Sequence, residues 1–189
     1  MMKRLIATLA LLALFVPAAS VWADEYDDTI KVFRKAGESG RYFQNAYGYA
    51  VFPTIGKGGE GIGGAYGEGH VYEKGKYIGN ATMTQVTIGF QLGGQAYSEI
   101  IFFRDQAALK DFTSGNFEFG AEASAVAITA GAGATASTTG TSAGASLQQK
   151  QAATVAEGYT RGMATFTIAK GGLMYAATIG GQKFKYTPR

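Results

Sequence analysis

From residue 46 onward the chain is a succession of short strand-forming runs separated by glycine turns, and this texture constrains its fold most. The runs lie at 47–52, 76–79, 81–91, 96–103, 163–168, 173–179 and 183–186. Turn signals between them include Lys74-Gly75, Gly93-Gly94 and Gly180-Gly181. Aromatic and β-branched runs bounded by such turns are typical of antiparallel hairpins, and the chain lacks helices long enough for parallel crossovers. We therefore predict a mainly β fold, an antiparallel β-sandwich or barrel-like meander.

One segment before these runs, residues 24–41, has helical periodicity. Tyr26, Ile30 and Phe33 recur at intervals that place them on one face of an amphipathic helix. Acidic residues open the segment and basic residues follow, which suits the helix dipole. We expect this N-terminal helix to pack on the sheet; the alternative is a helix that lies in a membrane interface.

A single short helix is predicted near the middle of the chain. Asp105 is placed to cap a helix over about 105–112, with Ala108, Leu109 and Phe112 facing inward. The tract 121–146, made almost entirely of Ala, Gly, Ser and Thr, is interpreted as two small-residue strands, with disorder as the alternative.

The first 23 residues have the pattern of a signal peptide. Lys3 and Arg4 precede about a dozen apolar residues, and Val21-Trp22-Ala23 resembles a cleavage site. We therefore expect a signal peptide over 1–23, a single domain over 24–189, and a periplasmic or secreted protein. The chain has no cysteine for a disulfide or an acyl anchor. Removing Lys3 and Arg4 from a formal charge of +3 leaves a nearly neutral domain, which disfavours nucleic-acid binding.

Catalytic and metal-binding patterns find little support. The one histidine, His70, lies in a glycine-rich run without a nucleophile elbow. Residues 59–64 match G-x-G-x-x-G, but a strand pattern follows where dinucleotide binding needs a helix. Glu60, Glu68 and Glu99 could form carboxylate pairs, as in any β-rich protein. We expect no enzymatic activity, no metal and no cofactor.

Cations next to aromatic residues are the remaining candidates for a site. They fall at hairpin turns, on one face of the last strand and at the end of the N-terminal helix: Lys57, Lys74, Lys76, Lys170, Lys183, Lys185, Arg34 and Lys35. Lysine binds phosphate as a point charge, and lysine with aromatic residues suits the headgroup region of a bilayer. We take these residues as candidate lipid-binding positions; solvated surface lysines are the alternative.

Six glycine- and aromatic-rich motifs follow one another along the chain: YGYAVFPTIGKGG at 47–59, GGAYGEG at 63–69, GFQLGGQ at 89–95, IFFRDQAAL at 101–109, FGAEAS at 119–124 and KGGLMY at 170–175. In this order they resemble the SYLF family of lipid-binding domains. The resemblance implies binding of anionic phospholipids, with a contribution from an N-terminal amphipathic helix. Some relatives also bind actin, but this chain has no comparable basic stretch after residue 23, so we expect no actin binding.

Two functions follow from these observations. The first is an exported phospholipid-binding module that docks peripherally on anionic membranes through lysine and aromatic turns. The alternative is a self-associating structural or surface β protein without a specific lipid ligand, and the sequence leaves homo-oligomers open. An outer-membrane barrel is disfavoured, because many strands carry glycine on both faces.

Overall fold

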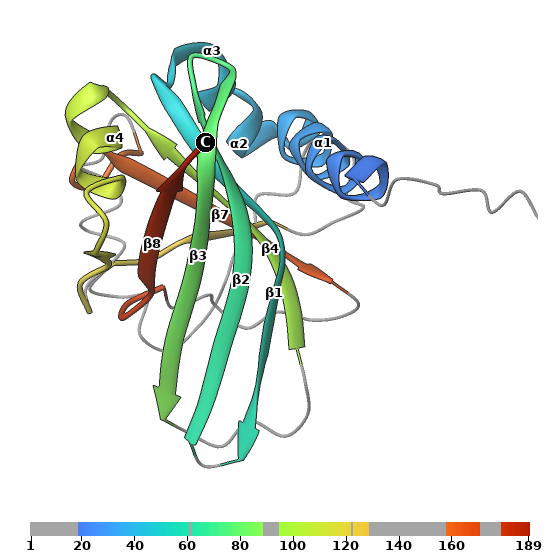
Figure 1. Ribbon diagram of the computed structural model, residues 1–189, viewed down its shortest axis with the longest axis vertical. Helices are drawn as coiled ribbons and strands as arrows, with labels where there is room; N and C mark the ends of the chain where they lie inside the picture. Colours follow the sequence, from blue (N-terminus) through green and yellow to red (C-terminus); the bar gives the residue numbers. More distant parts are fainter. Residues whose placement is uncertain (1–18, 61, 89–94, 122, 129–157, 171–178) are drawn as a thin grey trace, which may run out of the picture.

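The computed structural model describes residues 19–60, 62–88, 95–121, 123–128, 158–170 and 179–189 (Figure 1). Eight strands form one sheet in the order β5-β8-β3-β2-β1-β4-β7-β6. Their bounds are β1 Gly48–Glu60, β2 Ile62–Glu73, β3 Lys76–Ile88, β4 Gln95–Phe103, β5 Phe117–Glu118, β6 Val126–Ile128, β7 Met163–Lys170 and β8 Lys183–Pro188. All neighbours pair antiparallel except β6 and β7. The sheet is open and curled, so the prediction of a barrel-like antiparallel meander is confirmed.

The hairpin between β2 and β3 forms at the predicted turn. Glu73 pairs with Lys76, and the two residues between them, Lys74 and Gly75, both have positive φ, 48° and 78°. Two consecutive left-handed residues define the type I′ turn, whose twist matches that of the strands it joins. The sequence pair therefore sets the register next to the turn, and an irregularity between Val71 and Tyr72 shifts it by one residue farther along the ladder.

Pro53 lies inside β1. The predicted strand ends at residue 52, directly before this proline, so the observed strand is longer than predicted. The registers of β1 with both neighbours shift between Val51 or Phe52 and Ile55. Proline cannot donate to a strand ladder, and a bulge is one of the few places where a central strand tolerates it. The carbonyl of Pro53 accepts a 2.6 Å hydrogen bond from the Ser98 hydroxyl. The strand continues beyond the bulge to Glu60.

The N-terminal helix α1 spans Ala19–Lys35 and ends earlier than the predicted boundary at 41. Ala36 adopts an extended conformation, and two single-turn helices follow, α2 Gly37–Gly40 and α3 Tyr42–Asn45. The buried Ser39 hydroxyl donates a 2.6 Å hydrogen bond to the Phe33 carbonyl, which satisfies one of the free acceptors at the end of α1. The chain therefore turns onto β1, which begins at Gly48, through the short segment 36–47.

The short helix is confirmed as α4, Gln106–Phe112. Its N-cap is Asp105, whose carboxylate accepts a 3.0 Å hydrogen bond from the backbone N–H of Ala108. Ala108, Leu109 and Phe112 are buried, as their spacing indicated.

Two apolar layers cover the two faces of the sheet. The inner face carries α4 and a core that includes Phe52, Ile101, Phe103, Phe112 and Phe184. The outer face carries α1 to α3. Its core combines helix residues with strand side chains that point away from the inner face: Tyr26, Ile30, Phe33 and Tyr42 from the helices, and Val51, Ile100, Phe102, Ala164, Phe166 and Ile168 from the strands. The amphipathic helix is thus packed on the sheet through its predicted apolar face. No helix in the described part of the chain is long and apolar enough to cross a membrane.

Part of the small-residue tract is described. Val126–Ile128 forms β6, which pairs with β7 in parallel, with Val126 opposite Phe166. The second predicted strand of that tract, the predicted strand at 173–179 up to residue 178, and the Gly93-Gly94 turn lie outside the described residues.

Candidate functional site

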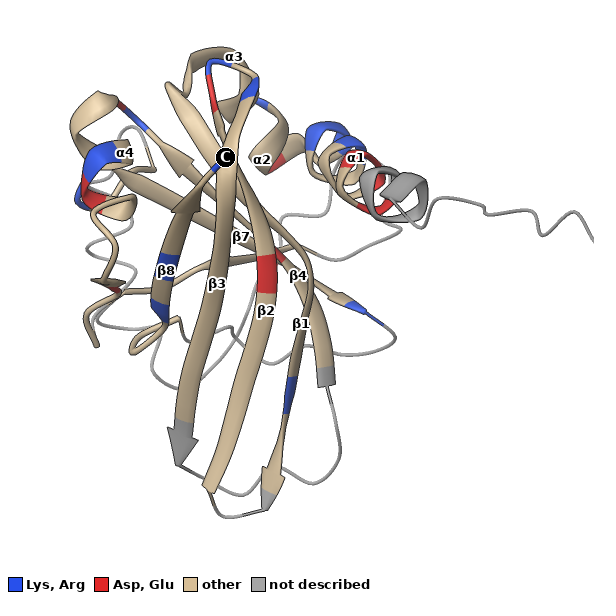
Figure 2. Cartoon of the chain, in the orientation of Figure 1, with Lys and Arg blue, Asp and Glu red and all other residues tan. Residues whose placement is uncertain are grey.

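Exposed cations gather at one end of the sheet. In an antiparallel sheet the start of one strand lies beside the end of the next, so residues before β1, β3 and β7 and after β2, β4 and β8 share an end. The set comprises Arg34, Lys35, Arg41, Lys74, Lys76, Arg104, Arg161 and Arg189, and all eight are exposed. We call it the basic end. Figure 2 shows basic segments around α3, the β2–β3 turn and the C-terminus, whereas the far parts of β1, β2 and β3 carry a single one.

Aromatic rings support several of these cations. The Arg34 guanidinium lies 4.9 Å from the Phe43 ring centroid, the Lys74 ammonium 5.0 Å from that of Tyr47, and the Arg189 guanidinium 5.6 Å from that of Tyr77. Arg41 lies 5.4 Å from the ring of Tyr42 in the same way. Such pairs orient a cation while leaving its N–H donors free for an anion.

Two carboxylates at the basic end, Glu73 and Asp105, are already engaged. The Tyr47 hydroxyl donates a 2.6 Å hydrogen bond to Glu73, and Asp105 caps α4 and pairs with Arg104 at 3.0 Å. The α4 backbone and Arg104 hold the pKa of the Asp105 carboxyl below its usual range. Within the described ranges, Lys74, Lys76 and Arg189 make no ion pair. Cations therefore outnumber carboxylates at this end, and the field there is positive.

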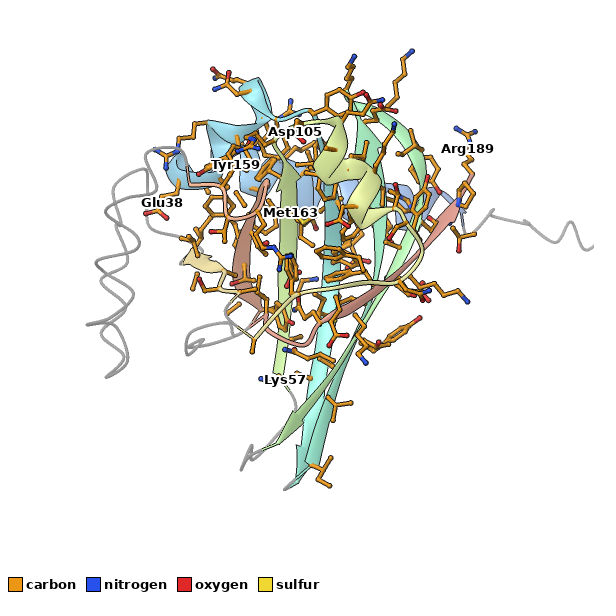
Figure 3. The ribbon with its side chains drawn as sticks, turned by 90° about the vertical axis from the view of Figure 1, so that its left-hand side faces the viewer. Glu38, Lys57, Asp105, Tyr159, Met163 and Arg189 are labelled. Carbon is orange, nitrogen blue, oxygen red and sulfur yellow. The ribbon has the colours of Figure 1, made fainter. Side chains whose placement is uncertain are left out.

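The structure brings together only part of the predicted site. Arg34, Lys35, Lys74 and Lys76 lie at the basic end, and Arg41, Arg104, Arg161 and Arg189 join them although the sequence analysis missed all four. Three of these could have been found from strand direction, because Arg104, Arg161 and Arg189 lie just outside β4, β7 and β8 at the same end of the sheet. Figure 3 shows Lys57 at the far end of the strands from Arg189.

The other predicted lysines are scattered. Lys57 is half-buried on the inner face, and this burial lowers the pKa of its ammonium. Lys170, at the end of β7, pairs with Glu25 of α1 at 3.3 Å and contacts the Thr54 hydroxyl. Lys183 lies 3.6 Å from Glu118. Lys183 and Lys185 share the exposed face of β8 while Phe184 is buried, as the alternation predicted.

A buried polar cluster lies on the inner face and was not anticipated. Glu99 of β4 is fully buried, and its Oε2 accepts a 3.0 Å hydrogen bond from the Gln182 amide, which lies 3.2 Å from the Tyr97 hydroxyl. Thr167 of β7 is the cross-strand partner of Glu99. Three buried oxygens of this cluster have no hydrogen-bond partner among the described residues: Glu99 Oε1, Thr167 Oγ1 and Gln182 Oε1. Burial raises the pKa of Glu99 to about 7, against a smaller opposing effect of Gln182.

The arrangement offers little to a hydrolytic mechanism. Glu68 is exposed on the outer face of β2, whereas Glu99 is buried on the inner face of β4, so these two cannot act on one substrate. His70 stacks on Tyr26 of α1 with ring centroids 3.5 Å apart, and its partial burial lowers its pKa. The described residues contain no group of three or more His, Cys, Asp or Glu that could hold a metal ion.

The fold and the basic end suit a β-rich binding domain. Residues 84–184, just over half of the chain, match the Ysc84 family, described as "Las17-binding protein actin regulator". The chain belongs to this family, the SYLF family of lipid-binding, membrane-associated domains.

One relative extends the similarity to most of the chain. The sequence is 26% identical over 164 residues to Beta cell expansion factor A of Aeromonas veronii. The alignment covers 82% of this chain and 51% of that protein, so the chain spans about half the length of this relative.

Proposed function

We propose that the protein is an exported, non-enzymatic module that docks peripherally on anionic phospholipid membranes through its basic end. The observation that carries the proposal is the gathering of eight exposed cations at one end of the sheet, four of them over aromatic rings. A Lys or Arg near an anionic membrane surface contributes about 1 kcal/mol to binding, and aromatic residues suit the headgroup region.

Docking by this end leaves α1 in place on the sheet. The C-terminal turn of α1 supplies Arg34 and Lys35 to the surface, while Tyr26, Ile30 and Phe33 remain in the core. The helix thus takes part through its charged end, and its apolar face need not enter the lipid.

The test is co-sedimentation of the purified protein with vesicles of phosphatidylcholine alone or mixed with phosphatidylglycerol, at low and moderate salt. The basic-end variant combines Arg34→Gln, Lys74→Gln, Lys76→Gln and Arg189→Gln. Loss of four cations worth about 1 kcal/mol each predicts that binding to anionic vesicles weakens by more than about 100-fold. Wild-type binding should also fall as salt screens the charges.

The matched control removes four cations elsewhere: Lys57→Gln, Lys170→Gln, Lys183→Gln and Lys185→Gln. This control contains the candidate lysines that lie away from the basic end, so it measures whether they contribute. Equal losses in both variants would mean that only net charge matters, and a loss in the control alone would move the docking surface away from the basic end. Large lipid-independent assemblies on gel filtration would favour the self-associating alternative.

A further inference from the structure

The strands β1, β2 and β3 extend past their neighbours at the end opposite the basic end. Pairing of β3 with β8 stops at Thr84–Lys183, and pairing of β1 with β4 stops at Lys57–Gln95. The β1–β2 and β2–β3 ladders continue to Ile62, which pairs with Glu60 on one side and Ile88 on the other. The described sheet is therefore three strands wide at this end, visible at the bottom of Figure 1.

The outer face of this projection carries exposed apolar side chains on a nearly flat surface. Ile62 is 73% exposed and Val86 is 76% exposed, and Tyr66 on the same face is 51% exposed. Gly58 of β1 and Gly64 of β2 lie in register with Val86, and neither has a side chain that could cover it. A Cβ placed on Gly58 would meet no atom within 4 Å. We call Ile62, Tyr66 and Val86 the apolar tip.

Along the projection an apolar residue comes first, and a lysine and a tyrosine follow farther from the extremity. Side chains of these kinds occur in the same order between the acyl chains and the headgroups of a bilayer. Ile62 is at the extremity of the described projection. Tyr66 lies four residues back along β2, and Lys57, on the inner face, is the register partner of Ala65, three residues back. At about 3.3 Å per residue these distances are roughly 13 and 10 Å. Interfacial elements bury their apolar side chains about 5–10 Å deep, with tyrosine and lysine at headgroup level.

The described side chains on the outer face of this projection carry no charge near its extremity: they are Ile62, Tyr66, Val86 and the glycines between them. The first described carboxylate on this face of β2 is Glu68, which accepts a 2.8 Å hydrogen bond from the Tyr66 hydroxyl, farther from the extremity. An uncharged face has no reason to prefer an anionic surface over a zwitterionic one.

We infer that the apolar tip is a second membrane contact, which inserts into the headgroup–acyl boundary of a phospholipid bilayer independently of lipid charge. This contact goes beyond the docking of the basic end: it lies at the other end of the molecule and depends on apolar burial. The two contacts therefore respond differently to salt and to mutation.

The first test measures binding to phosphatidylcholine vesicles in about 1 M salt, where the Debye length is about 3 Å and the basic end contributes little. The tip variant combines Ile62→Ser and Val86→Ser and should lose at least about tenfold in binding, since each removes an exposed aliphatic side chain available for burial. The matched control, Val32→Ser with Val126→Ser, removes two other exposed aliphatic side chains, 48% and 43% exposed, and should bind like wild type. Equal binding of the tip variant and wild type, or no wild-type binding under these conditions, overturns the inference.

The second test places a probe at the tip. The chain has no cysteine, so Ile62→Cys can carry a single environment-sensitive fluorophore, with Lys185→Cys as the control position. Neutral vesicles should shift the emission of the tip label to the blue and leave the control label unchanged. Insertion is contradicted if the emission of the tip label does not change when vesicles are added. It is also contradicted if the emission shifts with protein concentration in the absence of lipid, which would mean that a second copy of the chain covers the tip. Neither outcome affects docking of the basic end, which the low-salt anionic assay measures separately.

Discussion

Replacing Glu99 with glutamine should stabilise the protein at neutral pH and leave its stability near pH 4 almost unchanged. Glu99 is fully buried, and among the described residues no lysine or arginine pairs with it. The cluster has three buried oxygens without partners, and a proton on Glu99 supplies the donor that they lack. The folded protein therefore favours the neutral carboxylic acid, and glutamine is a neutral side chain of nearly the same shape.

The magnitude follows from the difference between the folded and unfolded pKa values. Burial raises the pKa of Glu99 from 4.5 to about 7. Between these values the folded protein keeps a proton that the unfolded chain has released, so stability falls as pH rises through this window and levels off above about 7. At about 1.4 kcal/mol per pH unit the loss is roughly 3 kcal/mol. In a domain of this size that is a change of about 10 °C in Tm.

Urea unfolding followed by circular dichroism at pH values from 4 to 8 measures this effect. The stability of the Glu99→Gln variant relative to wild type should rise by about 3 kcal/mol across the range. Glu68→Gln, at an exposed carboxylate, is the control and should follow the wild-type profile. Parallel profiles for wild type and Glu99→Gln would refute the reasoning, because they would mean that Glu99 titrates alike in the folded and unfolded chains.

Two further predictions concern the fold. Asp105→Ala should destabilise the protein by about 1 kcal/mol, because it removes the cap of α4, whereas Asp111→Ala at the exposed end of that helix should cost less; thermal unfolding compares the two. Gly69→Ala should cost about 1–3 kcal/mol, because its Cβ would lie 2.5–2.8 Å from three atoms of the buried Phe52 ring. Gly56→Ala, where a Cβ meets nothing within 4 Å, is the control, and equal losses at the two glycines would contradict the packing argument.

The features that could be predicted from the sequence are those with a local cause. Alternation placed Phe184 inside and Lys183 outside, the spacing of Ile30 and Phe33 gave the buried face of α1, and Asp105 marked the start of α4. Each depends on residues close together in the chain, where periodicity and capping act directly.

The features that escaped prediction depend on which distant segments meet. Pro53 would end an isolated strand, but a bulge against both neighbours accommodates it, and neither neighbour can be identified from residues 47–60 alone. Glu99 sits in a run that looks half-exposed by composition, and its burial arises from β7 and from Gln182. Arg189 reaches the basic end only because β8 pairs antiparallel with β3.

The candidate site shows the same division between composition and topology. The sequence pointed to cations beside aromatic residues as candidates, but it did not show which of them lie together in the fold. Lys74 and Lys76 lie at one end of the sheet and Lys57 toward the other, a separation set by strand length and direction. Whether the basic end is the lipid-binding surface is the question that the paired charge variants address.

The bonds that close the inner face have a consequence for how the chain folds. Gln182 reaches Glu99 and Tyr97 across 83 and 85 residues, the Gln85 amide donates to the Gly180 carbonyl across 95, and the Tyr186 hydroxyl donates to the Ile78 carbonyl across 108. The central strands therefore cannot satisfy their buried polar groups until the segment through Tyr186 is present. Contacts of such long sequence separation slow folding, because the chain must close long loops before these hydrogen bonds can form.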